Sequence, residues 1–347
     1  MRLVLWGVVA LAAVSGLSAC SGETKGVSAT GATQPKLRIV WRARVGQRAA
    51  ALANGAGGVW VASAAPPGVK DGRLFRLDPR TGRRTASVPV GWWPSGVAVG
   101  LGGAWVADSI GDGSRLKNNL PGLQNALTRI DLRGNRVIAT IAVPGIDSVA
   151  VGYNAVWATA LVGGAETLRR LDPRTNRVVA ELKLPGASGP LALGGGRVWA
   201  LTWFAEPAQH ARISEIDPRS NRVVGSITVP QAGPLSDLVY SGGVLWVSMV
   251  NPNPQGSLRG RVVRIDLRRR SQVGRAQLVP GATALAGNTS GVWVAGNRSL
   301  LLLDSKSGRT IGRLTLPGDV PEFAQALAAG PRAVWVIAGA RLIAIAS

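Results

Sequence analysis

Few residues of this sequence are suited to nucleophilic or acid–base chemistry, which limits the reactions that the protein could catalyse. Among 347 residues there is one histidine, His210, and one cysteine, Cys20. A Ser–His–Asp triad or a Cys–His dyad would have to use that histidine. Zinc sites built from several histidines and cysteines are excluded, as is an intrachain disulfide. His210 could act as a general base, although a single loop histidine is more often only solvated.

A second group of candidate residues is suited to binding. Trp92 and Trp93 stand directly before Pro94, and Trp203 and Phe204 stand in another segment that reads as a loop. Exposed aromatic rings could stack on a sugar or hold an apolar ligand. The alternative is that these rings pack the loops against the rest of the protein.

A third group consists of polar residues at matching places in repeated segments. Asp147, Asp237, Ser95, Thr283 and Gln325 each lie at or near the start of a short run of small apolar residues. Two carboxylates brought together there could hold a cation through their oxygens. The alternative is that they cap nearby backbone N–H groups. The sequence has no phosphate-binding loop, dinucleotide fingerprint or zinc-ligand spacing, so no cofactor is expected.

The elements that must position these residues follow from an internal repeat. The sequence Val-Trp-Val-Ala, or a close variant, recurs seven times at intervals of 42 to 52 residues. This interval is close to the length of a four-stranded propeller blade. A blade would bury such a tryptophan where neighbouring sheets face one another. The repeated tryptophans are Trp60, Trp105, Trp157, Trp199, Trp246, Trp293 and Trp335.

Each repeat contains four strand-like runs separated by turn residues. In the second repeat these runs are 95–100, 104–107, 126–131 and 136–143, and β-branched residues are enriched in them. The turn after the third run often reads Asp-Pro-Arg, in which Asp can accept backbone N–H groups and Pro presets φ. The aspartates expected to form these turns are Asp78, Asp131, Asp172, Asp217, Asp266 and Asp304.

The two ends of the repeat region predict a closed ring. The last repeat ends with the run 341–346 and lacks a fourth strand, whereas the run 37–46 has the fourth-strand pattern without a repeat of its own. Pairing of the two would remove exposed sheet edges. We therefore expect an all-β, seven-bladed β-propeller over residues 37–347, closed by an N-terminal outer strand on the last blade.

The repeats resemble the YVTN-type β-propellers of bacterial surface and envelope proteins. The residues that carry the resemblance are Arg76–Gly82, Val88–Gly91, Gly96–Gly100 and Ala104–Ala107. It implies a propeller fold and an envelope location, but no single function, since such propellers serve many roles. The segment 203–206 is similar to a motif of virginiamycin B lyases. It occurs once, and the other repeats lack that pattern, so no lyase activity is transferred.

The first residues predict export and lipid anchoring. Residues 1–19 combine Arg2, an apolar run too short to span a bilayer and small residues before Cys20, which is typical of a signal peptide. Residues 17–20, Leu-Ser-Ala-Cys, resemble the lipobox of bacterial lipoproteins, which implies cleavage before Cys20 and a diacylglycerol on its sulfur. Residues 20–36 then read as the lipidated cysteine and a flexible tether. The expected location is the extracytoplasmic face of the cell membrane.

Loop lengths distinguish the two rims of the expected ring. The loop rim carries the connections from the second to the third strand and from each fourth strand to the next blade, and the link 108–125 is the longest. Variable loops on a rigid scaffold usually carry binding, and the resemblance also places the ligand there. Acidic residues expected on or near the loop rim are Asp71, Asp108, Asp112, Asp147, Glu166, Glu206, Asp237, Asp319 and Glu322.

The formal charge of +22 comes mostly from arginine, and many arginines fall beside the Asp-Pro-Arg turns of the opposite turn rim. A basic turn rim could contact anionic lipid headgroups or wall polymers. The alternative is a solvated arginine surface that reflects coding bias. Nucleic acid is not expected, because the chain lacks aromatic–basic strips and is predicted to be exported. The turn-rim arginines are Arg80, Arg83, Arg84, Arg174, Arg177, Arg219, Arg222, Arg268, Arg269 and Arg270.

Two functions remain open from the sequence. The leading hypothesis is a non-enzymatic binding or scaffold protein that uses Trp92, Trp93, Trp203 and nearby polar groups for a glycan, an anionic envelope polymer or a protein partner. The alternative is a lyase or hydrolase with a cation-assisted site at the mouth of the central tunnel, which would use rim carboxylates, the bound cation and His210.

Overall fold

Short apolar runs between Gly- and Pro-containing turns form β-strands throughout the chain, as the sequence predicts. The structure is a computed structural model that describes residues 35–46, 48–65, 69, 71–108, 125–162, 165–186, 189–204, 210–230, 235–252, 258–319 and 324–346. The signal peptide and Cys20 expected from the sequence lie outside these residues. Within the described ranges no helix is long and apolar enough to cross a membrane.

The strands form seven four-stranded antiparallel sheets, and six of these sheets use consecutive strands. The first three, from the innermost strand outwards, are β2 (Ala49–Gly55), β3 (Gly58–Ser63), β4 (Gly72–Leu77) and β5 (Arg84–Val90); β6 (Pro94–Gly100), β7 (Gly103–Asp108), β8 (Ala126–Asp131) and β9 (Arg136–Ala142); and β10 (Ile146–Gly152), β11 (Ala155–Val162), β12 (Ala165–Asp172) and β13 (Arg177–Leu184).

The next three sheets repeat this order. They are β14 (Leu191–Gly194), β15 (Arg197–Phe204), β16 (His210–Asp217) and β17 (Arg222–Pro230); β18 (Leu235–Ser241), β19 (Val244–Pro252), β20 (Leu258–Asp266) and β21 (Ser271–Leu278); and β22 (Ala284–Asn288), β23 (Gly291–Gly296), β24 (Ser299–Leu303) and β25 (Thr310–Thr315). The seventh consists of β26 (Ala326–Ala329), β27 (Ala333–Ala338), β28 (Arg341–Ala346) and β1 (Arg38–Arg44).

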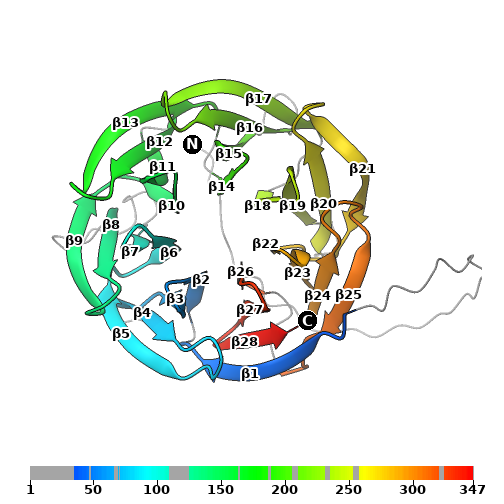
Figure 1. Cartoon of the computed structure of the whole chain (residues 1–347), viewed down its shortest axis with the longest axis horizontal. Coiled ribbons are helices and arrows are strands. Elements are labelled where there is room, and N and C mark those ends of the chain that lie inside the picture. The colour runs from blue at the N-terminus through cyan, green and yellow to red at the C-terminus, as the bar shows by residue number, and fades with distance from the viewer. Residues whose placement is uncertain are drawn as a thin grey trace, which may run out of the picture. The chain divides into compact units, whose positions relative to one another are not determined.

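The sheets stand around a central axis and close into a ring (Figure 1). Each innermost strand contacts the innermost strand of the next sheet, and β26 of the seventh sheet contacts β2 of the first. The outer strand β1 pairs antiparallel with β28, with Arg38 opposite Ala346 and Arg44 opposite Arg341. The predicted seven-bladed propeller and its closure by the first strand are confirmed.

The repeated tryptophans lie in the second strand of each sheet and are at most 4% exposed. Burial of a tryptophan removes about 150–250 Å² from water, so these side chains contribute strongly to sheet-on-sheet packing. In five sheets the indole N–H also donates to the carbonyl five residues earlier, at or just after the end of the innermost strand, at 3.1–3.3 Å. The indole nitrogens of Trp293 and Trp335 have no hydrogen-bond partner among the described residues.

The six predicted turn aspartates act as predicted. Asp78, for example, accepts the backbone N–H groups of Arg80 and Thr81 at 2.9 Å through one carboxylate oxygen. These bonds favour the ionised carboxylate and lower the pKa of Asp78. The same bond to the second or third residue after the aspartate is made by Asp131, Asp172, Asp217, Asp266 and Asp304.

In four of the seven sheets an arginine opposite the tryptophan connects the sheet to the next one. Arg76 lies across from Trp60 in the β3–β4 register, with its guanidinium carbon 5.0 Å from the ring centroid. The same guanidinium donates to the carbonyl of Leu132 at 2.9 Å, in the turn of the second sheet. Arg129, Arg170 and Arg264 repeat this arrangement, each stacking on its tryptophan and donating to the next turn.

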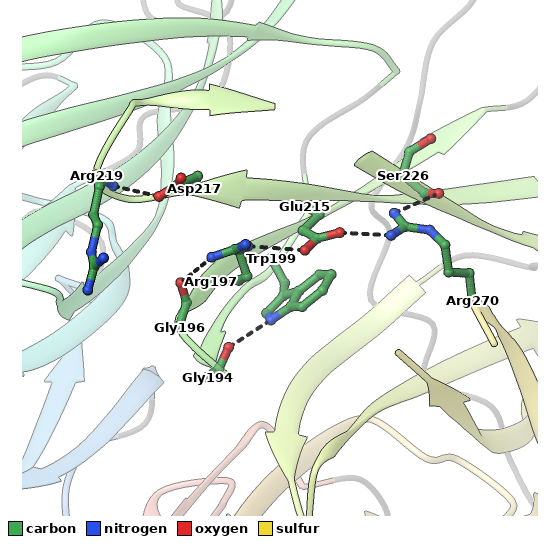
Figure 2. A network of polar contacts seen from close by, with 9 residues as sticks. All are labelled: Gly194, Gly196, Arg197, Trp199, Glu215, Asp217, Arg219, Ser226 and Arg270. Carbon is green, nitrogen blue, oxygen red and sulfur yellow. Dashed lines mark hydrogen bonds and ion pairs between the residues drawn. The ribbon is translucent and has the colours of Figure 1, made fainter. Parts of the chain in front are cut away.

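The fourth sheet connects to the fifth through an ion pair in which the acidic residue lies opposite the tryptophan and the arginine comes from the next sheet (Figure 2). Glu215 takes the place of the arginine opposite Trp199. Its carboxylate accepts from Arg197 at 3.1 Å and from Arg270 of the fifth sheet at 3.0 Å. Arg270 also donates to the carbonyl of Ser226 at 3.3 Å. Because the Glu215 side chain is only 15% exposed, this pair is better shielded from solvent than an ordinary surface ion pair.

We predict that a buried tryptophan whose indole N–H is hydrogen-bonded contributes more to stability than one whose indole N–H has no partner among the described residues. Trp105→Phe removes the donor to the Gly100 carbonyl, which is 3.2 Å away, and weakens the stacking of Arg129. Trp293→Phe removes no such bond, and Leu302 lies opposite Trp293. Trp105→Phe should therefore lower the free energy of unfolding by about 1–3 kcal/mol more than Trp293→Phe. Urea unfolding followed by far-UV circular dichroism measures both; equal losses would contradict the role given to the indole N–H.

Candidate functional site

The described part of the loop rim contains two clusters of aromatic and basic side chains. Most of the long connections on this rim lie outside the described residues, including the expected acidic residues Asp112, Glu206 and Glu322. The candidate site is therefore built from the strand ends and the shorter connections between fourth and first strands.

The first cluster joins Trp92, Trp93 and Arg48. The two indoles follow β5, and their ring centroids are 5.7 Å apart with planes tilted by 51°. Trp93 is 43% exposed. The guanidinium of Arg48, in the connection before β2, lies 5.7 Å from the Trp93 ring. The backbone of Trp92 is held in place, because its carbonyl accepts the Ala65 N–H at 3.0 Å. The cluster thus presents a partly exposed indole beside a positive charge.

The second cluster joins Phe204, His210 and Arg212. The rings of Phe204 and His210 are stacked, with centroids 4.6 Å apart and planes 3° from parallel. Arg212 lies 5.4 Å from the Phe204 ring. The sequence interpretation placed Trp203, Phe204 and His210 in a loop, which is wrong. Trp203 and Phe204 end β15, and His210 begins β16 opposite Phe204. Aromatic residues suit a strand end because cross-strand ring pairs stabilise it.

Several of the polar residues expected at the tunnel mouth link neighbouring sheets. The Ser95 hydroxyl donates to the Asp147 carbonyl at 2.9 Å, from the second sheet to the third. The Thr283 hydroxyl donates to the Ala324 carbonyl at 2.7 Å, from the sixth to the seventh. The Gln325 side-chain oxygen accepts the Gly339 N–H at 2.8 Å. The hydroxyls of Ser95 and Thr283 thus connect neighbouring sheets, whereas Gln325 forms its bond within the seventh sheet.

Asp237 also bridges two sheets. One of its carboxylate oxygens accepts the Leu238 N–H and the other accepts the Leu285 N–H, both at 2.8 Å. Burial raises the pKa of Asp237 to about 6, although the two backbone N–H groups oppose this change. This is the capping role that the sequence left open. Among the described residues no group of three His, Cys, Asp or Glu side chains could hold a metal ion.

Asp108 is a second buried carboxyl group near the loop rim. It ends β7, directly before the longest connection, and is only 1% exposed. One carboxyl oxygen accepts the Thr128 hydroxyl at 3.0 Å. Burial raises the pKa of Asp108 to about 7, because charging the group without water is unfavourable. Glu166, also expected near this rim, is fully buried in β12. Two of the acidic residues expected on the described part of the loop rim, Asp108 and Glu166, are thus buried and do not contribute to its surface.

Two basic residues in these clusters were not identified from the sequence. Arg212 could have been found, since a strand beginning at His210 places it opposite Thr202, two residues from Phe204. Arg48 has no such signal, because it comes from the connection before β2 and reaches Trp93 only through the packing of the first sheet. The expected arginines of the turn rim are all exposed.

Comparisons with known proteins agree with the propeller fold. No protein-family model matches the chain, and comparison with curated proteins gives no match. The solved WD40 β-propeller domain of Doa1 is similar, with 11% identity and a TM-score of 0.64 over 90% of this chain and 97% of that one. So is a catalytically inactive virginiamycin B lyase from Staphylococcus aureus with quinupristin, with 11% identity and a TM-score of 0.60 over 90% and 100%.

A third structure, BamB from Moraxella catarrhalis, has 13% identity and a TM-score of 0.49 over 87% of this chain and 85% of that one. The similarity to the Doa1 domain and to the lyase, together with the seven closed sheets, defines the class: the chain is a seven-bladed β-propeller. At identities this low the likeness shows a shared fold and no shared activity.

We predict that Asp108 makes stability depend on pH. The folded protein keeps a proton on Asp108 up to about pH 7, whereas the unfolded chain releases it near the ordinary value of 3.8. The folded state therefore binds more protons between these values, so the free energy of unfolding falls as pH rises from about 4 to 7. In Asp108→Asn this fall should be smaller, as measured by urea unfolding at several pH values.

The control is Asp78→Asn, since the pKa of Asp78 is lowered by its turn hydrogen bonds. The stabilisation from Asp78 is lost only as pH falls through its lowered pKa, so its substitution should leave the slope between pH 4 and 7 in place. If Asp108→Asn and the wild type give the same slope, the buried carboxyl group does not cause it.

Proposed function

We propose that this protein is a non-catalytic binding propeller, anchored to the outer face of a bacterial cell membrane, that holds an envelope glycan on its loop rim. The proposal includes membership of the YVTN-type propellers, a signal peptide over residues 1–19 and a lipidated Cys20 followed by a tether to residue 36. The Leu-Ser-Ala-Cys sequence at residues 17–20 and the repeats support these parts.

The observation that carries the binding role is the pair of aromatic–guanidinium clusters on the loop rim. An indole or phenyl ring can stack on the C–H face of a sugar ring, and a neighbouring arginine can donate to its hydroxyl or carboxylate groups. Trp93 with Arg48, and Phe204 with Arg212, each combine these two features within 6 Å. The stack of Phe204 on His210 places a further polar ring beside the second cluster.

The enzymatic alternative receives less support from the same residues. The cation-assisted mechanism needs carboxylate oxygens that are available for a metal, but both oxygens of Asp237 accept backbone N–H groups. His210 begins β16, and its ring stacks on Phe204 of the neighbouring strand β15. A binding role requires neither free carboxylate oxygens nor a loop histidine, so it is compatible with the observed contacts of Asp237 and His210.

The binding role is tested with soluble peptidoglycan fragments, titrated against the protein and followed by calorimetry. Trp93→Ala should weaken binding about tenfold or more, because the exposed stacking ring is lost while the buried core is unchanged. Tyr153→Ala is the matched control, since Tyr153 is 37% exposed and lies on the turn rim between β10 and β11. Equal binding by the wild type and Trp93→Ala, or none by the wild type, would reject a glycan site at this cluster.

Lipid anchoring is tested separately in bacteria grown with a labelled fatty acid. The wild-type chain should incorporate the label and sediment with membranes, whereas Cys20→Ala should do neither, because the sulfur that carries the diacylglycerol is missing. Ser21→Ala, one residue further on, is the matched control and should keep the label. Label on Cys20→Ala would show that the acyl chain is attached elsewhere.

A further inference from the structure

Three neighbouring sheets expose apolar side chains at the beginning of their outer strands. In the second, third and fourth sheets two consecutive β-branched residues there are 39–54% exposed. The outer strands β5 and β21 are more polar or smaller at these positions, with Arg84-Thr85-Ala86 and Ser271-Gln272-Val273, whereas β1 of the seventh sheet, away from these three, has Ile39 and the 51% exposed Val40. The exposed pairs are Val137 and Ile138, Val178 and Val179, and Val223 and Val224.

A β-bulge explains why both members of each pair are exposed. In the third sheet Leu171 pairs with Val178 and Arg170 with Ala180, so Val179 has no partner in the register. The same shift leaves Ile138 and Val224 without partners in their sheets. An extra residue interrupts the strict alternation of side chains between the two faces of a strand. The bulge recurs in the outer strand of the other sheets, so the backbone explains why both residues are exposed, and the choice of β-branched residues is what distinguishes these three sheets from the first and the fifth.

Basic side chains surround these pairs. An exposed arginine precedes each pair, at positions 136, 177 and 222, and the preceding turns contribute exposed Arg133, Arg174 and Arg219. The aspartates of the same turns accept backbone N–H groups. Part of their charge is therefore already compensated. This region of the turn rim is consequently apolar at its edge and positive around it.

A cavity of about 820 Å³ opens in the same region. It extends from the inner turns of the second and third sheets to the outer turns of the third and fourth. Arg129 and Arg170 lie in its wall, and each is held by the next turn. Arg174 has a side chain that is 90% exposed. The other lining residues are Leu101, Asn154, Asp172, Pro173, Val179 and Asn221.

We propose that the turn rim of the second to fourth sheets is a docking surface for an anionic lipid bilayer. The valine and isoleucine pairs enter the interface between headgroups and acyl chains, and the arginines around them contact lipid phosphates. The cavity takes one anionic headgroup, to which Arg174 and the amides of Asn154 and Asn221 can donate. Val179 belongs to both the apolar pairs and the cavity wall, so the two features form one surface.

The path of the chain is consistent with a bilayer as the partner. Arg38 begins β1 opposite Ala346, the last residue of β28, and so lies at the turn rim. Only 17 residues lie between Cys20 and Arg38, and a flexible linker of that length, as the proposed function assumes, would reach about 20–25 Å. A lipid on Cys20 would thus hold the turn rim, not the loop rim, close to the membrane. The docked orientation leaves the loop-rim clusters facing away from the lipid.

The surface is tested with the unit 34–347, which contains all seven sheets and is compact by itself. Its binding to phosphatidylglycerol vesicles and to phosphatidylcholine vesicles is measured by co-sedimentation. The wild type should bind the anionic vesicles and should bind the neutral ones at least tenfold more weakly. Both Val178→Ser/Val179→Ser and Arg174→Gln/Arg177→Gln should weaken binding to the anionic vesicles about tenfold, since each removes one of the two contributions.

Matched controls separate this surface from general charge. Arg268→Gln/Arg269→Gln removes the same charge from a turn of the fifth sheet, which has no exposed apolar pair, and Leu278→Ser removes an 82% exposed side chain from the other end of β21. Both should keep at least half of the wild-type affinity. Near-ultraviolet circular dichroism verifies the fold of every variant.

Three results would overturn the proposal. Equal weakening by the controls and the test variants would indicate non-specific attraction of a basic protein. Binding of soluble glycerol phosphate as strong as that of vesicles, with no effect of Val178→Ser/Val179→Ser, would indicate a site for a free anion. Absence of binding to phosphatidylglycerol vesicles by the wild type would exclude the docking surface itself. None of these results bears on the loop-rim site, which is measured with a different ligand.

Discussion

The packing of one indole against its neighbours is the constraint on which the ring depends. Each second strand places a tryptophan where its sheet meets the next, and nearly all of that side chain is withdrawn from water. Five of the indoles also donate to the carbonyl at or just after the end of the innermost strand, and four carry an arginine that reaches the next turn. A single position therefore combines burial, hydrogen bonding within a sheet and contact between sheets, so its repetition produces a ring.

Different residues can make the contact between neighbouring sheets, provided that they join the second-strand tryptophan region of one sheet or the closing strand to the turn of the next. In the fourth sheet Glu215 replaces the arginine and the charge comes from Arg270 of the next sheet. At the closure no repeat supplies the arginine, and Trp41 of β1 donates its indole N–H to the Pro79 carbonyl of the first turn at 3.1 Å. This bond reaches the same kind of turn carbonyl that Arg129 reaches in the third sheet. The first strand therefore completes both the last sheet and the contact with the first.

The two rims have different chemistry because the chain uses them differently. On the turn rim short turns are held by aspartates, so its surface is regular, and repeated arginines and bulged apolar pairs accumulate there. On the loop rim the strand ends and connections vary from sheet to sheet, which allows isolated clusters such as Trp92 with Trp93 and Phe204 with His210. A regular rim suits an extended surface such as a bilayer, whereas a variable rim suits a ligand of defined shape.

The sequence alone determined the repeat, the seven buried tryptophans, the turn aspartates and the closing strand, because each depends on local residue patterns that recur. The tertiary structure decided what distant residues do together. Packing between sheets brings Arg48 to Trp93 and Asp237 to the Leu285 N–H, and pairing of β15 with β16 moves Phe204 and His210 from an expected loop into a stacked pair. The cavity and the exposed valines depend on sheet contacts and on a one-residue bulge, for which the sequence has no local signal.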